Sequence, residues 1–388
     1  MSFRYLSKDI LHGYDKYKYN SIDSSPVSKY ITHPFWNFCV QFFPRWLAPN
    51  VITLSGFMLL VIQYSLFTYY DPYFYASDTS HPEYPPVPSW LWLVAAGCMF
   101  WAHTLDGIDG KQARRTGMSG PLGELFDHGL DSWATLFMPI GMYSVFGRGS
   151  FSIPPERCFP IILGVMFTFS ISHWEKYNTG VLFLPWGYDI SQLAMTLVYL
   201  NTWIFGYEIY KFSYAGFTVG DAFEFLMHFS VWGFSIPMSL WNVYVSYRDR
   251  TGKMYSLWDN IKPLVPIFIE FALFLMWMRY SSYDIIKKQP RLFTTSCGTV
   301  FSHITCRLIV NSMANTDCDI FNWLLIPLAA IVIGVLTIPL GIIELYLLWA
   351  YTIFVTAAHI HYGICVVQQL AEHLNIYIFT VGRPEKTE

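Results

Sequence analysis

Two runs of sequence decide how the chain folds: DGIDGKQAR at residues 106–114 and GELFDHGLD at residues 123–131. Each run carries two aspartates and lies beside a long apolar segment. Asp106 and Asp109 are three residues apart, and Asp127 and Asp131 are four apart. Side chains with these spacings lie on one face of a helix. Two helix ends that meet here can therefore bring four carboxylates together.

The ordinary alternative is that these aspartates are helix-end charges paired with the nearby cations Lys111, Arg114 and Arg115. A carboxylate near the middle of a spanning helix costs roughly 2.5–3.5 kcal/mol. Four converging carboxylates would also repel one another unless cations neutralised them. Ionisable clusters within a membrane are functional sites by default, so we favour a functional cluster. Gly107 and Gly123 leave space for a ligand or a backbone to approach.

The composition indicates a membrane protein. Of 388 residues, 54% are hydrophobic and 13% are charged, whereas soluble proteins carry about 25% charged residues. The 15 Trp, 27 Tyr and 32 Phe residues suit a protein anchored at two membrane interfaces. A net charge of −3 does not suggest a nucleic-acid partner. Seven scattered cysteines without a CxxC pair support neither a disulfide framework nor a zinc site. The charged first thirty residues predict no cleavable signal peptide.

A spanning helix needs about 20 mostly apolar residues, and the chain has ten candidates. We predict an all-α integral membrane protein with about ten transmembrane helices, near residues 49–70, 89–105, 123–146, 159–174, 189–207, 221–245, 261–279, 292–312, 321–338 and 340–367.

The segment before the first helix, HPFWNFCVQFFPRW at residues 33–46, is rich in aromatic residues and too short to span a membrane. We predict that it is an amphipathic segment lying in the membrane interface. The expected organisation is a cytosolic and interfacial N-terminal segment at 1–47, a membrane domain at 48–368 and a cytosolic C-terminal tail at 369–388.

Lysine and arginine in short loops predict the orientation, because they are more frequent on the cytosolic side. The N-terminal flank and the loop around Lys111 carry several such residues, whereas residues 71–88 carry none. This distribution places the N-terminus and the aspartates in the cytosol. Lys287, Lys288 and Arg291 fall on the opposite side and depart from the rule.

The aspartates offer only oxygen ligands, which favour Mg²⁺ or Mn²⁺ over zinc. Two metal ions held by carboxylates can stabilise the attacking and leaving oxygens of a phosphoryl transfer. Arg114 adds a forked donor suited to phosphate oxygens. Lys111 is weaker evidence for a phosphate contact, since lysine is common in cytosolic loops.

Together the two runs read DxxDGxxAR, eight residues, then GxxxDxxxD. This pattern resembles the signature of the CDP-alcohol phosphotransferase family at Asp106, Asp109, Gly110, Ala113, Arg114, Gly123, Asp127 and Asp131. The resemblance covers nearly the whole chain and is greatest to the choline/ethanolamine branch, at residues 15–19, 33–36, 110–115, 122–132 and 173–180. Vertebrate ethanolamine-specific members carry a selenocysteine near the C-terminus, and residues 381–388 here contain none.

The resemblance implies a role for each matching residue. Two Mg²⁺ or Mn²⁺ ions would be held by Asp106, Asp109, Asp127 and Asp131. The CDP-alcohol would contact Asn50, Gly110, Lys111 and Arg114. The proton acceptor would be His128, assisted by Glu124 four residues earlier, which on a helix can reach the imidazole ring.

The activity that the resemblance implies is transfer of phosphoethanolamine from CDP-ethanolamine to the hydroxyl of diacylglycerol, which gives phosphatidylethanolamine and CMP. It also implies an endoplasmic reticulum or Golgi membrane location and a homodimer.

Two rival functions remain. An enzyme of the same family could use CDP-choline or both donors, because the sequence does not reveal the head-group contacts. A cation-coupled transporter could use the aspartates as an ion path, although this does not explain the ordered Gly, Ala and Arg positions.

Several residues allow two interpretations. Asn50 could be a helix cap instead of a ligand contact, and Glu175 and Lys176 could contact the donor or form an ion pair. Glu270, His359 and His361 have no assigned role.

Overall fold

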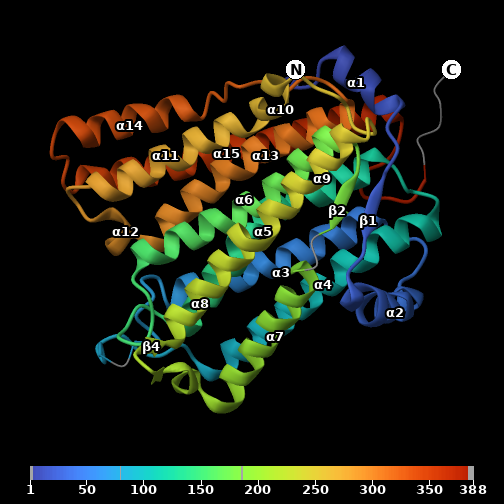
Figure 1. The fold of residues 1–388 in the computed structure, drawn as a ribbon. Coiled ribbons are helices and arrows are strands. Elements are labelled where there is room, and N and C mark those ends of the chain that lie inside the picture. The colour runs from blue at the N-terminus through green and yellow to red at the C-terminus, as the bar shows by residue number, and fades with distance from the viewer. Residues whose placement is uncertain (1–2, 79, 185–186, 383–388) are drawn as a thin grey trace.

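The protein is built almost entirely of helices (Figure 1). The computed structural model describes residues 3–78, 80–184 and 187–382. The α-helices are α1 (Lys8–Asp15), α2 (His33–Cys39), α3 (Pro49–Tyr70), α4 (Ser89–Thr116), α5 (Pro121–Phe146), α6 (Pro155–Thr179), α7 (Gly187–Phe205), α8 (Val219–His228), α9 (Ile236–Arg248), α10 (Leu257–Ile261), α11 (Val265–Tyr280), α12 (Ile285–Lys288), α13 (Pro290–Ala314), α14 (Leu325–Thr337) and α15 (Ile343–Leu374). Short 3-10 or π turns are η1 (Ser28–Thr32), η2 (Val40–Phe42), η3 (Tyr207–Tyr210), η4 (Phe229–Ser235) and η5 (Lys262–Leu264). The strands are β1 (Ser21–Asp23), β2 (Leu182–Leu184), β3 (Ser213–Tyr214) and β4 (Phe217–Thr218).

All ten segments predicted to span coincide with a helix or a continuous helical run. By length and composition, five described helices or helical runs can cross a membrane: Pro49–Tyr70, Ser89–Thr116, Pro155–Thr179, Leu257–Tyr280 and Ile343–Leu374. The apolar α14 is shorter. Other long helices, such as α5 and α13, fall below this hydropathy because they carry many polar side chains. The chain is therefore a helical multi-pass membrane protein.

Helix α13 shows where those polar side chains go. It packs against α5, α6, α11 and α15 and is buried along nearly its whole length. Ser302 of α13 accepts or donates hydrogen bonds with Ser132 (2.6 Å) and with His359 (3.0 Å), and Trp133 Nε1 donates to Thr299 Oγ1 (3.2 Å). Polar side chains on α13 thus bond to other helices, and the low hydropathy reflects helix packing.

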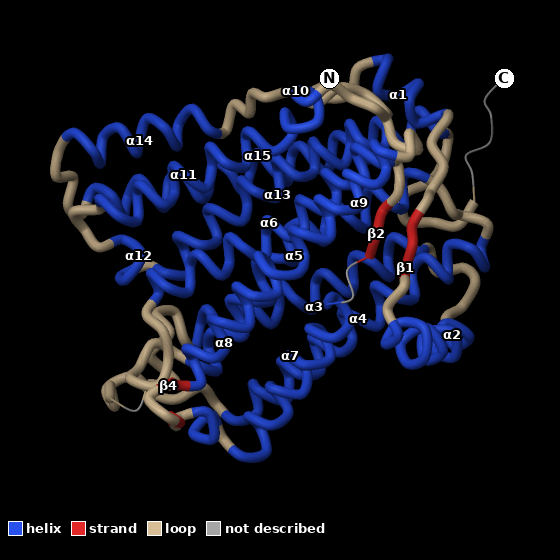
Figure 2. Tube along the Cα trace, viewed as in Figure 1, coloured by secondary structure: helices blue, strands red, loops and turns tan. Residues whose placement is uncertain are grey.

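The helices have two distinct ends (Figure 2). At one end, on the right, lie α1, α2 and the parallel pair β1–β2, in which Ile22 is opposite Phe183. At the other end lie α12 and the antiparallel pair β3–β4. Parallel strands need a long connection, and here the connection includes helices α2 to α6. The N-terminal segment is therefore fixed to a part of the chain that is synthesised much later.

The turn between α4 and α5 belongs to the first of these ends. Gly117 follows the last residue of α4 and has a left-handed backbone (φ 70°), which favours glycine. Pro121 is the first residue of α5, where proline fits because its missing N–H has no helical partner. This short turn reverses the chain and places the end of α4 beside the start of α5.

The N-terminal segment packs on the helices as well as exposing aromatic side chains. Phe38, Phe42 and Trp46 are 59%, 71% and 74% exposed, which suits the predicted interfacial position. Trp36 is buried against α4: a Cβ on Gly107 would lie 2.2 Å from its ring, so only glycine permits this contact. At the C-terminus, α15 continues to Leu374, beyond the expected domain boundary at residue 368. Residues 383–388 of the expected tail lie outside the described residues.

Candidate metal and phosphate site

The turn between α4 and α5 brings three of the four predicted aspartates together. Asp106, Asp109 and Asp127 each offer a carboxylate oxygen, and these oxygens lie within 4.8 Å of one another. Asp131 is not part of this group of three. It lines, together with Asp106, a narrow cavity of about 20 Å³ between α3, α4, α5 and α7, which is enough for about one water molecule.

The protein supplies few partners for these carboxylates. Tyr188 OH donates to Asp106 Oδ2 (3.0 Å), and Thr53 Oγ1 donates to Asp109 Oδ2 (2.5 Å). Asp127 Oδ1 is buried without a hydrogen-bond partner. Carboxylates this close repel one another, and a buried oxygen without a partner is costly. An all-oxygen donor set fits Mg²⁺ or Mn²⁺, so the residues present suit a bound divalent cation.

The nearby basic residues do not neutralise the aspartates. Lys111 Nζ donates to Asn37 Oδ1 (2.8 Å), and Arg115 donates to backbone carbonyls of the N-terminal segment, including that of Phe43 (3.2 Å). Arg114 is exposed. Within residues 3–78, 80–184 and 187–382, no salt bridge joins the four aspartates to a lysine or arginine. The helix-end pairing considered from the sequence is therefore wrong for Lys111 and Arg115, which hold the N-terminal segment instead.

His128 lies at the edge of the carboxylate group. Its ring nitrogens are 3.9 Å from Glu124 Oε1 and 3.9 Å from Asp127 Oδ2, and Nδ1 is buried without a hydrogen-bond partner. The ring of His173 lies beside it, with centroids 5.1 Å apart. The spacing of four residues correctly placed Glu124 near His128. The expected hydrogen bond between them is absent, because 3.9 Å is too long for one.

Glu124 instead bonds to two residues from distant parts of the chain. Lys176 of α6 forms a buried ion pair with it, and Tyr17 OH donates to its carboxylate at 2.7 Å. Lys176 Nζ also donates to Tyr17 OH (2.7 Å). Burial and the neighbouring carboxylate raise the pKa of the Tyr17 phenol, which keeps its proton. Of the two interpretations left open for Lys176, the structure contains the ion pair. Its neighbour Glu175 accepts a hydrogen bond from Asn242 (2.7 Å).

Asn50 lies at the start of α3, facing α5. It does not cap the helix, because the cap position is Ala48 and no side chain caps there. Asn50 Nδ2 donates to the backbone oxygen of Ile378 (2.9 Å). A Cβ on Gly123 would lie 3.7 Å from Asn50 Oδ1, and one on Gly110 would lie 3.7 Å from Arg114. A side chain at either glycine would therefore contact a predicted donor-binding residue, Asn50 or Arg114.

Sequence reasoning missed the residues that support the site from other elements. Besides Thr53, Tyr188 and Tyr17, a buried network links His103 and Asp189: His103 Nε2 bonds to Asp189 Oδ1 (2.8 Å), and Thr32 Oγ1 donates to Asp189 Oδ2 (3.3 Å). His103 is one helical turn before Asp106. The only signal for His103 in the sequence is its spacing of three residues from Asp106. Nothing in the sequence pointed to Asp189.

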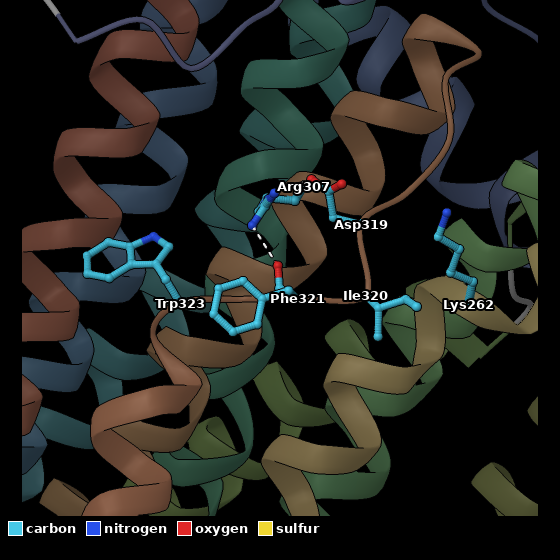
Figure 3. A pocket seen from close by; sticks show the side chains of 6 residues that line it. All are labelled: Lys262, Arg307, Asp319, Ile320, Phe321 and Trp323. Atoms are coloured by element: carbon cyan, nitrogen blue, oxygen red, sulfur yellow. Dashed lines mark hydrogen bonds and ion pairs between the residues drawn. The ribbon is translucent and has the colours of Figure 1, made fainter.

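A larger cavity, of about 540 Å³, lies away from the carboxylates (Figure 3). It is lined by Lys262, Arg307, Asp319, Ile320, Phe321 and Trp323. Arg307 donates to the backbone oxygen of Phe321 (3.2 Å) and pairs with Asp319 (2.6 Å). With a single carboxylate, this cavity does not have the donor set of a divalent cation site.

Comparison with known proteins gives one consistent answer. A family model for CDP-alcohol phosphatidyltransferases matches residues 46–206, which include all the predicted site residues. The chain is 47% identical over 387 residues to ethanolaminephosphotransferase 1 of Mus musculus, covering 98% of this chain and 96% of that protein. It is 46% identical over 386 residues to the Homo sapiens protein of the same name, with the same coverage. It is 30% identical over 396 residues to choline/ethanolaminephosphotransferase 1 of Arabidopsis thaliana, covering 95% of this chain and 96% of that protein.

Proposed function

Because the chain belongs to the CDP-alcohol phosphatidyltransferase family, we propose that it transfers phosphoethanolamine from CDP-ethanolamine to diacylglycerol. The observation that carries the proposal is the group of three carboxylates, Asp106, Asp109 and Asp127, within the matched family region. The near full-length similarity to ethanolaminephosphotransferase 1 supports ethanolamine as the head group. The relatives named here are enzymes, and none of the findings supports the transporter alternative.

In the proposed reaction, the hydroxyl oxygen of diacylglycerol attacks the phosphorus that carries ethanolamine. A phosphorus–oxygen bond forms to the lipid, and the bond from that phosphorus to the CMP oxygen breaks. The hydroxyl proton passes to the imidazole of His128, whose Nδ1 has no other partner. Glu124, held by Lys176 and Tyr17, places negative charge near the imidazolium that forms.

The four aspartates would hold two divalent cations, with Asp131 completing the set from the adjoining cavity. Bound Mg²⁺ or Mn²⁺ supplies positive charge that offsets the charge developing on the leaving phosphate. Asn50, Gly110, Lys111 and Arg114 would lie on the CDP side. For Lys111 this requires that its ammonium leave Asn37.

The wider assignment is also a proposal. All ten helical segments cross the membrane, with the site facing the cytosol, where the charged donor is soluble. Two of the three cations that depart from the positive-inside rule are paired with carboxylates: Lys287 Nζ lies 3.0 Å from Glu156, and Arg291 lies 3.6 Å from Asp71. The third, Lys288, lies over the ring of Tyr283, 4.0 Å from its centroid. The division into residues 1–47, 48–368 and 369–388, the endoplasmic reticulum or Golgi location and the homodimer are retained.

The test is transferase activity of the purified chain in lipid nanodiscs that contain diacylglycerol. CDP-ethanolamine with Mg²⁺ should give CMP and phosphatidylethanolamine in equal amounts, and CDP-choline should react more slowly. Equal rates with both donors would indicate a dual enzyme. Absence of CMP release from either donor would overturn the proposal.

A further inference from the structure

The chain that follows α15 folds back onto the starts of α3 and α5. Asn375 has a left-handed backbone (φ 51°), which ends α15 and turns the chain. Ile376 and Ile378 then pack beside the buried cluster that contains Leu122 and Leu125 of α5. The segment at residues 376–379, called the C-terminal segment below, is thus held against the start of α5 by apolar contacts.

Two further contacts connect the C-terminal segment to the site. Asn50 Nδ2 donates to the backbone oxygen of Ile378 (2.9 Å). The ring of Phe379 lies edge-on to that of Phe126, with centroids 5.8 Å apart and an interplanar angle of 79°. Phe126 directly precedes Asp127 in the carboxylate group. The segment therefore lies between the start of α3 and the first turns of α5.

These contacts leave binding capacity unused. A carboxamide has two N–H donors and an acceptor oxygen, so Asn50 can bond to Ile378 and still offer a second N–H and Oδ1. A Cβ on Gly123 would lie in van der Waals contact with that oxygen, at 3.7 Å, so glycine leaves this side of the amide uncovered. Phe379 is 46% exposed although its ring is positioned by Phe126. An exposed aromatic ring held in place is a surface on which a nucleobase can stack.

We propose that Ile378 and Phe379 of the C-terminal segment are part of the nucleotide-binding site. The backbone oxygen of Ile378 fixes the Asn50 amide, and Phe379, backed by Phe126, provides the surface for the pyrimidine ring of the CDP-alcohol. This inference rests on the proposed function, because it assigns one part of the same donor. The diphosphate then extends from the aromatic pair toward the carboxylate group. One member of that group, Asp127, directly follows Phe126 in the sequence.

The experiment compares point variants of the full chain in nanodiscs. Phe379→Ala should raise KM for CDP-ethanolamine and the Kd for CDP about tenfold, the size of one base–aromatic stack. The kcat and the KM for diacylglycerol should stay near wild-type values. Phe379→Tyr keeps the aromatic face and should restore nucleotide affinity. The matched control is Tyr377→Ala, which removes a similarly exposed ring from the same segment and should leave all four constants unchanged.

The outcomes separate this inference from the proposed function. If the wild type releases no CMP from CDP-alcohols, the proposed function fails. If the wild type is active but Phe379→Ala has unchanged nucleotide KM and Kd, only the inference is overturned. A lower nucleotide KM for Phe379→Ala would show that the segment obstructs the site, and would also overturn it. Equal effects of Phe379→Ala and Tyr377→Ala would point to general loosening of the segment and count against a stacking role.

Discussion

The two ends of the helices contain buried aspartates in opposite circumstances. At one end, Asp71 accepts a hydrogen bond from the backbone N–H of Ala76 (3.1 Å) and lies 3.6 Å from the guanidinium of Arg291. Arg291 also donates to the backbone oxygen of Asp71 (2.6 Å) and stacks 4.2 Å from the ring of Phe74. At the other end, beside the turn between α4 and α5, Asp106, Asp109 and Asp127 lie close together, and no lysine or arginine among the described residues forms a salt bridge with them.

We infer that the difference separates a structural charge from a functional one. The buried pair Asp71–Arg291 stabilises the native packing only as long as both partners are present, because removing one leaves an uncompensated charge. In the proposed function, the carboxylate group beside the α4–α5 turn is completed by a bound cation. Stability should therefore depend on Asp71–Arg291, and metal binding and turnover on the carboxylate group. Four predictions test this division.

The largest effect is expected at the carboxylate group. Asp106→Asn, Asp109→Asn and Asp127→Asn should each abolish turnover, because each removes a charged oxygen donor for the cation. Size-exclusion profiles should match the wild type, since the substitutions relieve repulsion between carboxylates. Chelation of divalent cations should stop the wild-type reaction, and Mg²⁺ or Mn²⁺ should restore it. Full activity in excess chelator would contradict the assignment.

The second prediction concerns stability without a change in activity. Arg291→Met should lower the free energy of unfolding by about 3–5 kcal/mol, the typical cost of breaking a buried pair. It should be measured as a loss of thermal stability in detergent. Turnover per folded molecule should remain near wild type. The control is Lys287→Met, which removes an exposed pair with Glu156 and should change stability by less than about 1 kcal/mol. If Arg291→Met lost activity without losing stability, the structural role assigned to the Asp71–Arg291 pair would be contradicted.

The third prediction concerns the proton acceptor. His128→Ala should lower kcat by roughly a hundredfold, the usual contribution of a general base, with little change in the Kd for CDP-ethanolamine. His173→Ala is the control, because its ring lies beside that of His128 (centroids 5.1 Å apart) and, among the described residues, no ion pair joins it to the four aspartates. Its kcat should stay near wild type. Near wild-type turnover of His128→Ala between about pH 6 and 9 would assign the proton to another group.

The smallest effect is expected from a supporting hydrogen bond. Tyr188→Phe removes the donor to Asp106 Oδ2 and should raise the Mg²⁺ concentration at half-maximal activity by roughly tenfold, since a hydrogen bond to a charged group contributes about 1.5–3 kcal/mol. The measurement is a Mg²⁺ titration of initial rates. Tyr210→Phe, which loses a long bond (3.4 Å) to the Val198 carbonyl, should not shift the titration.

The parts of the site that are close in sequence were predictable. Helix spacing places Asp106 with Asp109, and the eight residues between the two runs are too few for anything but a turn, so Asp127 had to be near. The same reasoning overestimated how closely the Glu124 carboxylate approaches the ring of His128, four residues later on the helix. Its carboxylate is bonded to Tyr17 and Lys176 instead. Those two residues come from distant elements, and helix periodicity gives no information on such contacts.

The fold follows the same rule. Apolar runs marked all ten helical segments, because burial in lipid or against other helices requires apolar surface along each of them. Hydropathy could not distinguish a helix such as α13, whose threonines and serines bond to neighbouring helices, from one that faces lipid. The partner of Lys111 could not be found from helix spacing either, because Asn37 is 74 residues away.

The attachment of the N-terminal segment affects how the protein is made. Tyr5 N bonds to Gln369, 364 residues later, and α1 packs on α13 and α15. During synthesis at about 5–20 residues per second, the first residues wait roughly 20–70 s before these contacts can form. The partners of Tyr17, Glu124 and Lys176, are made much earlier, but α1 meets its packing surface only when α13 and α15 are present. The docking of the N-terminus on these two helices is therefore among the last contacts of the fold to form.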